Sequence, residues 1–282
     1  MSRAHGRQGD PVPPPEALPV PVVDAHCHLD LTGGDVGRQV ELARSVGVRT
    51  VVSIGIDVTT SRWQAEIAAE HEDVWAAVAV HPNEAGAGAA TAEALDEIAR
   101  LAALPQVRAV GETGLDYYRT DSAGGQAEQE RSFRAHIAIA KQSGKALVIH
   151  DREAHDDVLR VLAEEGAPEV TVIHAFSGDA DFARRCAAAG YYMSFAGNVS
   201  FKNAANLREA AAVVPAGLLL VETDAPFLTP MPFRGRPNGS HLIPLTMRVL
   251  AETRGEQLEV TCAAVAANAT RVFALEKGHR GR

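Results

Sequence analysis

Residues 145–165, KALVIHDREAHDDVLRVLAEE, carry the pattern that decides the fold. The apolar, β-branched run 145–150 predicts a short strand, and the amphipathic stretch 152–165 predicts a helix. The strand is apolar without strict alternation, which is typical of a parallel strand buried on both faces. It ends in His150. The same unit recurs along the chain, so its repetition decides the architecture.

Eight such units predict a (β/α)8 TIM barrel, because alternating strands and helices favour a parallel sheet and such barrels span about 250 residues. The predicted strands are 21–26, 49–55, 74–80, 107–111, 145–150, 170–174, 190–195 and 217–223. The predicted helices are 36–46, 59–71, 91–103, 126–143, 152–165, 179–189, 203–213 and 241–253, with a last pair in 256–275. The alternative is an open doubly wound sheet. It would need a G-x-G-x-x-G turn after the first strand, where HCHLD stands instead.

Composition limits the function classes. The 282 residues carry a net charge of −9, which excludes a nucleic-acid coat but not a nuclease with a local basic rim. No apolar run has the length of a membrane span, and the first 21 residues lack the apolar centre of a signal peptide. Three cysteines far apart do not form a disulfide framework, which favours the cytoplasm. We expect a disordered, proline-rich head (1–21), one domain (22–275) and a flexible tail (276–282).

Ionisable residues gather at the predicted strand ends, where barrels place their active sites. They are His26, His28, Glu112, His150, His174 and Asp224. A single histidine or carboxylate there is more often structural, but six of them at five strand ends favour a metal site. His26 and His28 point the same way on one strand, so both can bind one ion. Four imidazoles and two carboxylates exceed one tetrahedral shell, which predicts two divalent ions about 3.5–4 Å apart with a bridging carboxylate.

Five motifs extend this pattern over residues 22–275. They are HCHLD (26–30), GETGLDYYR (111–119), VIHDREA (148–154), HAFSG (174–178) and VETDAPFLTPMPFRGR (221–236). Together they resemble the TatD family of metal-dependent deoxyribonucleases, which are amidohydrolase-like barrels. The resemblance implies a hydrolase that acts on DNA, and in some members on RNA, typically as a 3′→5′ exonuclease on single strands.

The resemblance also assigns roles to the site residues. It implies that His26 and His28 hold the first ion with Glu112 and Asp224. Glu112 would bridge to a second ion, which His150 and His174 complete. Asp224 would orient the attacking water or take its proton, and Asp224 and Glu112 are the predicted catalytic residues. The ions are expected to be Mg²⁺, Mn²⁺ or Zn²⁺. Hydrolysis is expected to use metal-activated water without a covalent intermediate.

The chain departs from the family pattern at three places, and none of them removes a ligand. Ala175 stands where the family often has cysteine, and Ala225 stands where serine is usual. Asn238 is followed by Gly and Ser where the family usually shows N-E-P. This last change alters a loop at the predicted site, so it bears on substrate preference rather than on chemistry.

Basic and aromatic residues near the strand ends are candidate contacts for phosphates and bases. The predicted substrate contacts are Tyr117, Arg119, His81, Arg152, Lys202, Arg234 and Arg236. The alternative is that exposed arginines only solvate loops and helices. Asp116 is expected to brace the Glu112 loop. The histidines in predicted helices are expected at the surface. They are His71, His136, His155 and His241.

Two other function classes remain open. One is an amidohydrolase-type deacylase or amidase, for example on aminoacyl-tRNA, because one barrel and metal site can serve either chemistry. Many amidohydrolases carry a carboxylated lysine where Glu112 stands, which favours the phosphoesterase. The other is a non-catalytic metal-binding protein, against which the complete ligand set argues. We expect nucleic acid, single-stranded DNA ends in particular, as the substrate, no membrane partner, and a monomer or small homo-oligomer.

Overall fold

The computed structural model describes residues 12–275, which divide into two compact units. Unit 1 consists of residues 12–53 and 178–271, and unit 2 of residues 54–177 and 272–275. The first part of the predicted head, residues 1–11, and the predicted tail, residues 276–282, lie outside the described residues.

Unit 1 contributes four strands: β1 (Val22–Cys27), β2 (Val48–Ile54), β7 (Tyr192–Phe195) and β8 (Leu219–Val221). Its α-helices are α1 (Leu29–Thr32), α2 (Val36–Ser45), α8 (Ala180–Ala188), α9 (Ala205–Val213), α10 (Ile243–Arg254) and α11 (Leu258–Val272). Three short 3-10 turns are η1 (Gly197–Ser200), η2 (Ala216–Leu218) and η3 (Ser240–Leu242). Strand β1 is parallel to β2, and β7 is parallel to β8. A parallel bridge from Cys27 to Ala225 joins the end of β1 to the segment after β8.

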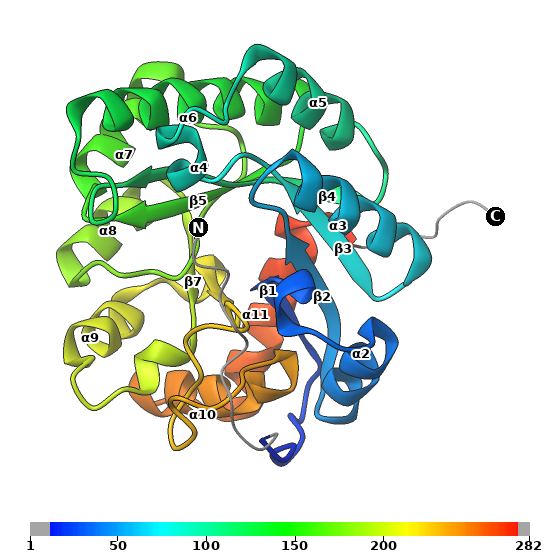
Figure 1. The fold of residues 1–282 in the computed structure, drawn as a ribbon. Coiled ribbons are helices and arrows are strands. Elements are labelled where there is room, and N and C mark those ends of the chain that lie inside the picture. The colour runs from blue at the N-terminus through cyan, green and yellow to red at the C-terminus, as the bar shows by residue number, and fades with distance from the viewer. Residues whose placement is uncertain (1–11, 276–282) are drawn as a thin grey trace. The chain divides into compact units, whose positions relative to one another are not determined.

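Unit 2 contributes β3 (Val74–Val78), β4 (Val107–Asp116), β5 (Ala146–Arg152) and β6 (Thr171–Ile173). Its helices are α3 (Val58–Glu70), α4 (Pro82–Gly86), α5 (Ala92–Ala102), α6 (Ala123–Ser143) and α7 (His155–Glu165). These strands pair in parallel in the order β3-β4-β5-β6. Helices α5, α6 and α7 pack along strands β4 and β5 (Figure 1).

The strands are buried on both faces, which explains their apolar sequences. Every residue of β3 is buried, and successive residues Leu147, Val148 and Ile149 of β5 expose at most 1% of their surface. Two helices of unit 2 begin where a polar side chain caps them: Asp57 accepts from Thr60 N–H at 2.7 Å before α3, and Ser122 accepts from Gly125 N–H before α6. Alternating strands and helices with parallel pairing in chain order confirm the predicted (β/α)8 fold class.

Strand β4 runs five residues beyond its predicted end at Gly111. It continues because Thr113 pairs with Ile149 and Asp116 pairs with Arg152 on β5. Gly114 permits this close approach, since a Cβ there would lie 2.1 Å from the carbonyl oxygen of His150. The extension places Glu112 inside a strand rather than on a loop. At the C-terminus one helix, α11, stands in place of the predicted pair.

Residues 12–21 belong to unit 1 and pack against the rest of it, so the prediction of a disordered head is wrong for this part. Val12 and Leu18 are buried. The N–H of Leu18 donates to the carbonyl of Val46 at 3.0 Å, and the imidazole of His241 lies 3.2 Å from the carbonyl oxygen of Val12. These apolar contacts outweigh the proline-rich composition. Within residues 12–275, none of the helices combines the length and apolar character needed to cross a bilayer. The cytoplasmic location stays a prediction.

Candidate metal centre

Unit 1 brings together three of the predicted ligands, which we name the first cluster: His26, His28 and Asp224. The two Nε2 atoms of the histidines are 3.4 Å apart. Asp224 Oδ1 lies 3.7 Å from Nε2 of His26 and 3.6 Å from Nε2 of His28. Both histidines are buried and Asp224 is largely so. The cluster therefore presents two imidazoles and a carboxylate around one point.

Main-chain hydrogen bonds hold the first cluster in place. The N–H of Asp224 donates to the carbonyl of His26 at 2.9 Å, and the N–H of His28 donates to the carbonyl of Ala225 at 2.8 Å. Asp224 adopts a left-handed backbone conformation with φ 52°. Such conformations cost free energy in residues other than glycine and concentrate at functional sites, although aspartate tolerates them better than most. This turn directs the Asp224 carboxylate back toward β1.

Sequence reasoning missed Asp24, a fully buried carboxylate two residues before His26. Its oxygens accept hydrogen bonds from Thr223 N–H at 2.9 Å and Thr223 Oγ1 at 2.6 Å, and from His26 N–H at 3.3 Å. Burial raises the pKa of Asp24 to about 7, against these hydrogen bonds, which lower it. Asp24 joins β1 to the segment that carries Asp224. Its partner Thr223 is 199 residues away, so local sequence held no signal for the contact.

The loop after Asp224 is held by Asn238, the residue before the two positions, Gly239 and Ser240, that depart from the family pattern. The side-chain amide of Asn238 donates to the carbonyls of Thr223, at 3.0 Å, and of Phe227, and its oxygen accepts from Gly239 N–H at 2.9 Å. Phe227 in turn stacks edge-on against His28, with ring centroids 6.1 Å apart. The amide thus ties the loop to the first cluster.

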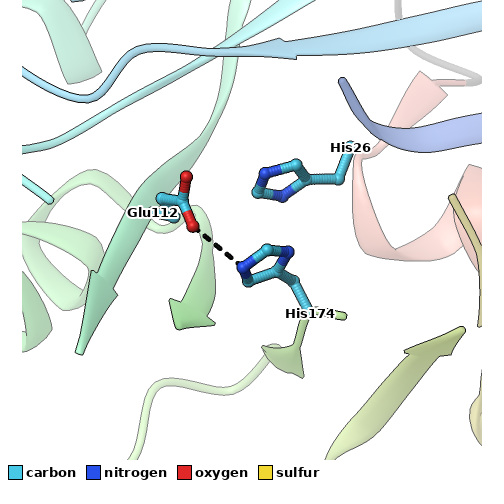
Figure 2. A group of neighbouring side chains, drawn as sticks. All are labelled: His26, Glu112 and His174. Carbon is cyan, nitrogen blue, oxygen red and sulfur yellow. Dashed lines mark ion pairs between the residues drawn. The ribbon is translucent and has the colours of Figure 1, made fainter. Parts of the chain in front are cut away.

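Unit 2 brings together the other three predicted ligands, the second cluster: Glu112, His150 and His174. Oε2 of Glu112 lies 2.8 Å from Nε2 of His174, the pair joined by the dashed line in Figure 2. The same oxygen lies 3.3 Å from Nδ1 of His150, and the two imidazole nitrogens are 3.5 Å apart. The three atoms form a small triangle. Glu112 lies within β4, His150 lies within β5, and His174 directly follows β6.

Asp116 orients His150 from the far side of the ring. Its Oδ2 lies 3.2 Å from Nε2 of His150. His150 therefore faces a carboxylate on each side of its ring, Asp116 at Nε2 and Glu112 at Nδ1. If Nδ1 binds an ion, the ring hydrogen is on Nε2, which donates it to Asp116. Burial lowers the pKa of His150, but the hydrogen bonds that its protonated ring donates to Asp116 and Glu112 outweigh burial and raise the pKa. The pKa of Asp116 falls to about 2, since burial, which raises it, is outweighed by hydrogen bonds from His150 and Arg119 N–H.

Asp116 is itself fixed by neighbours that sequence reasoning missed. Its N–H donates to Oε1 of the buried Gln129 on α6 at 2.9 Å, and its Oδ2 accepts from Nδ2 of Asn83 at 3.3 Å. The sequence predicted that Asp116 would brace the Glu112 loop. Its side chain contacts His150 instead, because β4 extends to Asp116 and pairs there with β5.

His81 lies beside the second cluster, and its tautomer follows from one contact. Its Nδ1 accepts the N–H of Asn83 at 3.0 Å, so the hydrogen of the neutral ring is on Nε2. That nitrogen is 3.7 Å from Oε2 of Glu112, and the His81 ring packs edge-on against His150. Burial lowers the pKa of His81 to about 3, although the charge of Glu112 acts in the opposite direction. The low pKa keeps the ring neutral. His81 thus presents an N–H donor rather than a lone pair.

Both clusters have the chemistry and the spacing of a metal site. An ion with tetrahedral bonds of about 2.0–2.1 Å holds neighbouring ligand atoms about 3.4 Å apart. The separations are 3.4–3.7 Å in the first cluster and 2.8–3.5 Å in the second. Imidazoles with one or two carboxylates suit Zn²⁺, Mn²⁺ and related divalent ions. The bond from His150 to Asp116 is the support that metal-binding histidines usually have. The residues present therefore fit divalent ions.

The predicted substrate contacts in unit 2 differ in how available they are. The hydroxyl of Tyr117 donates to Asp157 at 2.9 Å, so it is already engaged. Its neighbour Tyr118 is exposed and carries the guanidinium of Arg152 over its ring. Arg119 is exposed, and its main-chain N–H donates a hydrogen bond to Oδ1 of Asp116.

The predicted contacts in unit 1 are Lys202, Arg234 and Arg236. Lys202 is exposed. Arg234 is also exposed, and its guanidinium lies 4.2 Å from the ring centre of Phe201. Arg236 lies 5.7 Å from the ring centre of Phe233, and its carbonyl accepts from the hydroxyl of Thr229 at 2.7 Å. The two arginines thus belong to a loop that is folded on itself.

The expectation that helical histidines lie at the surface is wrong for His136. This residue is fully buried in α6, where Nε2 accepts the N–H of Val80 at 3.0 Å and Nδ1 donates to the carbonyl of Ser132 at 2.7 Å. Burial lowers the pKa of His136 to about 4. The helical spacing of Phe133, His136, Ile137 and Ala140 is the signal that could have placed it on the buried face.

The family follows from a comparison with known proteins. The model of the family described as TatD related DNase matches residues 23–274, nearly all of the described chain. This chain belongs to the TatD family. It is therefore a metal-dependent hydrolase, as the names of its relatives state.

Two relatives and one solved structure show how far the similarity extends. The TatD-family chain is 45% identical to an uncharacterised metal-dependent hydrolase, TatD, of Mycobacterium tuberculosis, over 90% of its own length and 98% of the relative's. It is 37% identical to YabD of Bacillus subtilis, over 89% and 98%. The crystal structure of the TatD homologue YJJV from Escherichia coli superposes with a TM-score of 0.84 at 26% identity, over 90% and 98%.

Proposed function

We propose that this TatD-family chain is a deoxyribonuclease that hydrolyses phosphodiester bonds from the 3′ end of single-stranded DNA, and that it carries two divalent ions, one on each cluster. The observation that carries the proposal is the pairing of imidazoles with a carboxylate in both clusters, in a chain that matches a family described as DNases. RNA is a second substrate of the same chemistry. We further propose a monomer or small homo-oligomer.

Bound divalent ions would lower the pKa of water and neutralise the charge of a phosphodiester. The residues of the chain would supply the rest. The N–H of Asp224 donates a hydrogen bond to the carbonyl of His26, which holds Asp224 where it would orient the attacking water or accept its proton. His81 would donate its Nε2–H to a phosphate oxygen. Glu112 contacts both histidines of the second cluster, and its bridging role stays a prediction from the family.

The test is hydrolysis of single-stranded DNA labelled at its 3′ or 5′ end, with Mg²⁺, Mn²⁺ or Zn²⁺ supplied separately. We expect mononucleotides released from the 3′ end, and loss of activity in Asp224→Asn. Asp96→Asn, a change at an exposed position on α5, is the matched control and should keep full activity. No nucleotide release by the wild type, together with turnover of an aminoacyl ester, would overturn the nuclease in favour of a deacylase. Activity that survives Asp224→Asn would identify a contaminating nuclease.

A further inference from the structure

Arg152 shares its strand with a residue of the second cluster. It is the last residue of β5, two residues after His150, so both side chains leave the same face of the strand. Two residues along a parallel strand span about 6.6 Å. The strand therefore places the guanidinium of Arg152 on the side of β5 that carries His150, two residues farther along the strand.

An exposed aromatic ring fixes the plane of this guanidinium. The central carbon of the Arg152 guanidinium lies 3.9 Å from the ring centre of Tyr118, which is 59% exposed. Stacking uses the flat face of the guanidinium and leaves the N–H groups at its edge for other partners. A guanidinium held in this way presents a rigid fork of donors, which matches the oxygens of a phosphate better than a flexible ammonium does.

Arg152 also differs in charge pairing from the arginines on the helices of unit 2. Five of those arginines form ion pairs with carboxylates: Arg62, Arg100, Arg131, Arg134 and Arg160. Arg152 has no ion pair within residues 12–275. Its register partner Asp116 directs its carboxylate to His150 and Asn83 instead. The positive charge beside the second cluster is thus left for an external anion.

We propose that Arg152, held by Tyr118, is a binding subsite for a phosphate group, and that in the nuclease it holds a phosphate of the substrate next to the second cluster. This second part rests on the proposed function, whereas phosphate binding itself does not. Tyr118 is a positioning residue, and Tyr117, whose hydroxyl is bound to Asp157, does not belong to the subsite.

The test is a calorimetric titration of the full-length chain with inorganic phosphate. Metal ions are first removed by chelation, so that bound ions cannot hold the anion. We expect Arg152→Met to weaken phosphate binding by about 10-fold to 100-fold, as loss of a charged hydrogen-bonding group usually does. Arg152→Lys should recover only part of the affinity. Tyr118→Leu should weaken binding, and Tyr118→Phe, which keeps the ring, should not. Arg100→Met is the matched control and should bind phosphate as the wild type does.

Thermal unfolding checks that each variant is folded. Unchanged phosphate affinity in folded Arg152→Met, or no phosphate binding by the wild type at millimolar concentration, would overturn the subsite.

In DNA hydrolysis we expect Arg152→Met to raise KM by a similar factor with little change in kcat. The two proposals fail separately. If DNA is not hydrolysed but phosphate binding depends on Arg152, only the nuclease is wrong. If DNA is hydrolysed but phosphate binding does not depend on Arg152, only the subsite is wrong.

Discussion

The hydrogen bond from Nε2 of His150 to Oδ2 of Asp116, 3.2 Å long, decides which nitrogen of His150 faces the second cluster. Nδ1 lies 3.3 Å from Oε2 of Glu112, and when it binds an ion the ring hydrogen is on Nε2, which donates it to Asp116. A carboxylate behind a metal-binding imidazole fixes the ring and increases its basicity. This contact therefore connects the packing of β4 on β5 to the metal chemistry of the second cluster.

Removing this carboxylate should weaken metal binding. We expect Asp116→Ala to lower the affinity of one site for Zn²⁺ or Mn²⁺ by about 10-fold to 100-fold, because His150 loses its orienting partner. Asp116→Asn, which can still accept a hydrogen bond, should have an intermediate effect. Calorimetric titration of metal into the chelator-treated protein measures this. Asp96→Ala on the exposed face of α5 is the control. If folded Asp116→Ala binds metal at each site with the same affinity as the wild type, the role of Asp116 is contradicted.

The buried His136 should make stability depend on pH. Burial lowers its pKa from 6.5 to about 4 in the folded chain, so between these values the unfolded chain binds more protons. Stability from this residue is complete above about pH 6.5 and is lost as pH falls toward about 4, by roughly 3 kcal/mol in total.

His136→Leu should cost about 1–3 kcal/mol at pH 7.5, since the N–H of Val80 loses its acceptor. The stability difference from wild type should shrink by about 2 kcal/mol at pH 5, where the variant has no buried histidine to protonate. Urea unfolding of the metal-free proteins at both pH values gives this difference. A difference that is the same at pH 7.5 and pH 5 would show that His136 does not titrate as described.

Asn238 should control the order of the loop after Asp224. Asn238→Ala removes two donors and an acceptor inside the loop, and we expect a loss of about 1–3 kcal/mol in local stability. Trypsin should then cleave faster after Arg234, which Gly235 follows, whereas the bond from Arg236 to Pro237 resists the protease. Asn203→Ala, at an exposed position, is the matched control. Equal cleavage rates in wild type and Asn238→Ala would mean that other contacts hold the loop.

The sequence predicted the strands well because each is a continuous apolar run, and this placed the six metal-ligand candidates. It failed where structure depends on pairing rather than on composition. The segment after Gly111, ETGLD, holds a single apolar residue, Leu115, so its composition predicts no strand, yet β4 continues to Asp116 because β5 offers it partners. As a result Asp116 contacts His150 on β5, a partner that the sequence does not predict.

Buried polar residues were the other gap. Asp24 pairs with Thr223, 199 residues away, and Asn238 bonds to main-chain carbonyls that no side-chain pattern reveals. His136 does leave a signal in the sequence, since it occupies the apolar face of its helix, although its residue type alone favours an exposed position. Val12 and Leu18 are also buried, but the prolines around them in the sequence favour a disordered segment.

The central claim is that each cluster holds one divalent ion, and the number of ions per chain tests it most directly. Metal content should be measured by mass spectrometry after reconstitution and dialysis, for the wild type, for His28→Ala in the first cluster and for His174→Ala in the second. We predict two ions per chain in the wild type and one in each folded variant. A wild type that retains no ion, or variants that keep both ions, would contradict it.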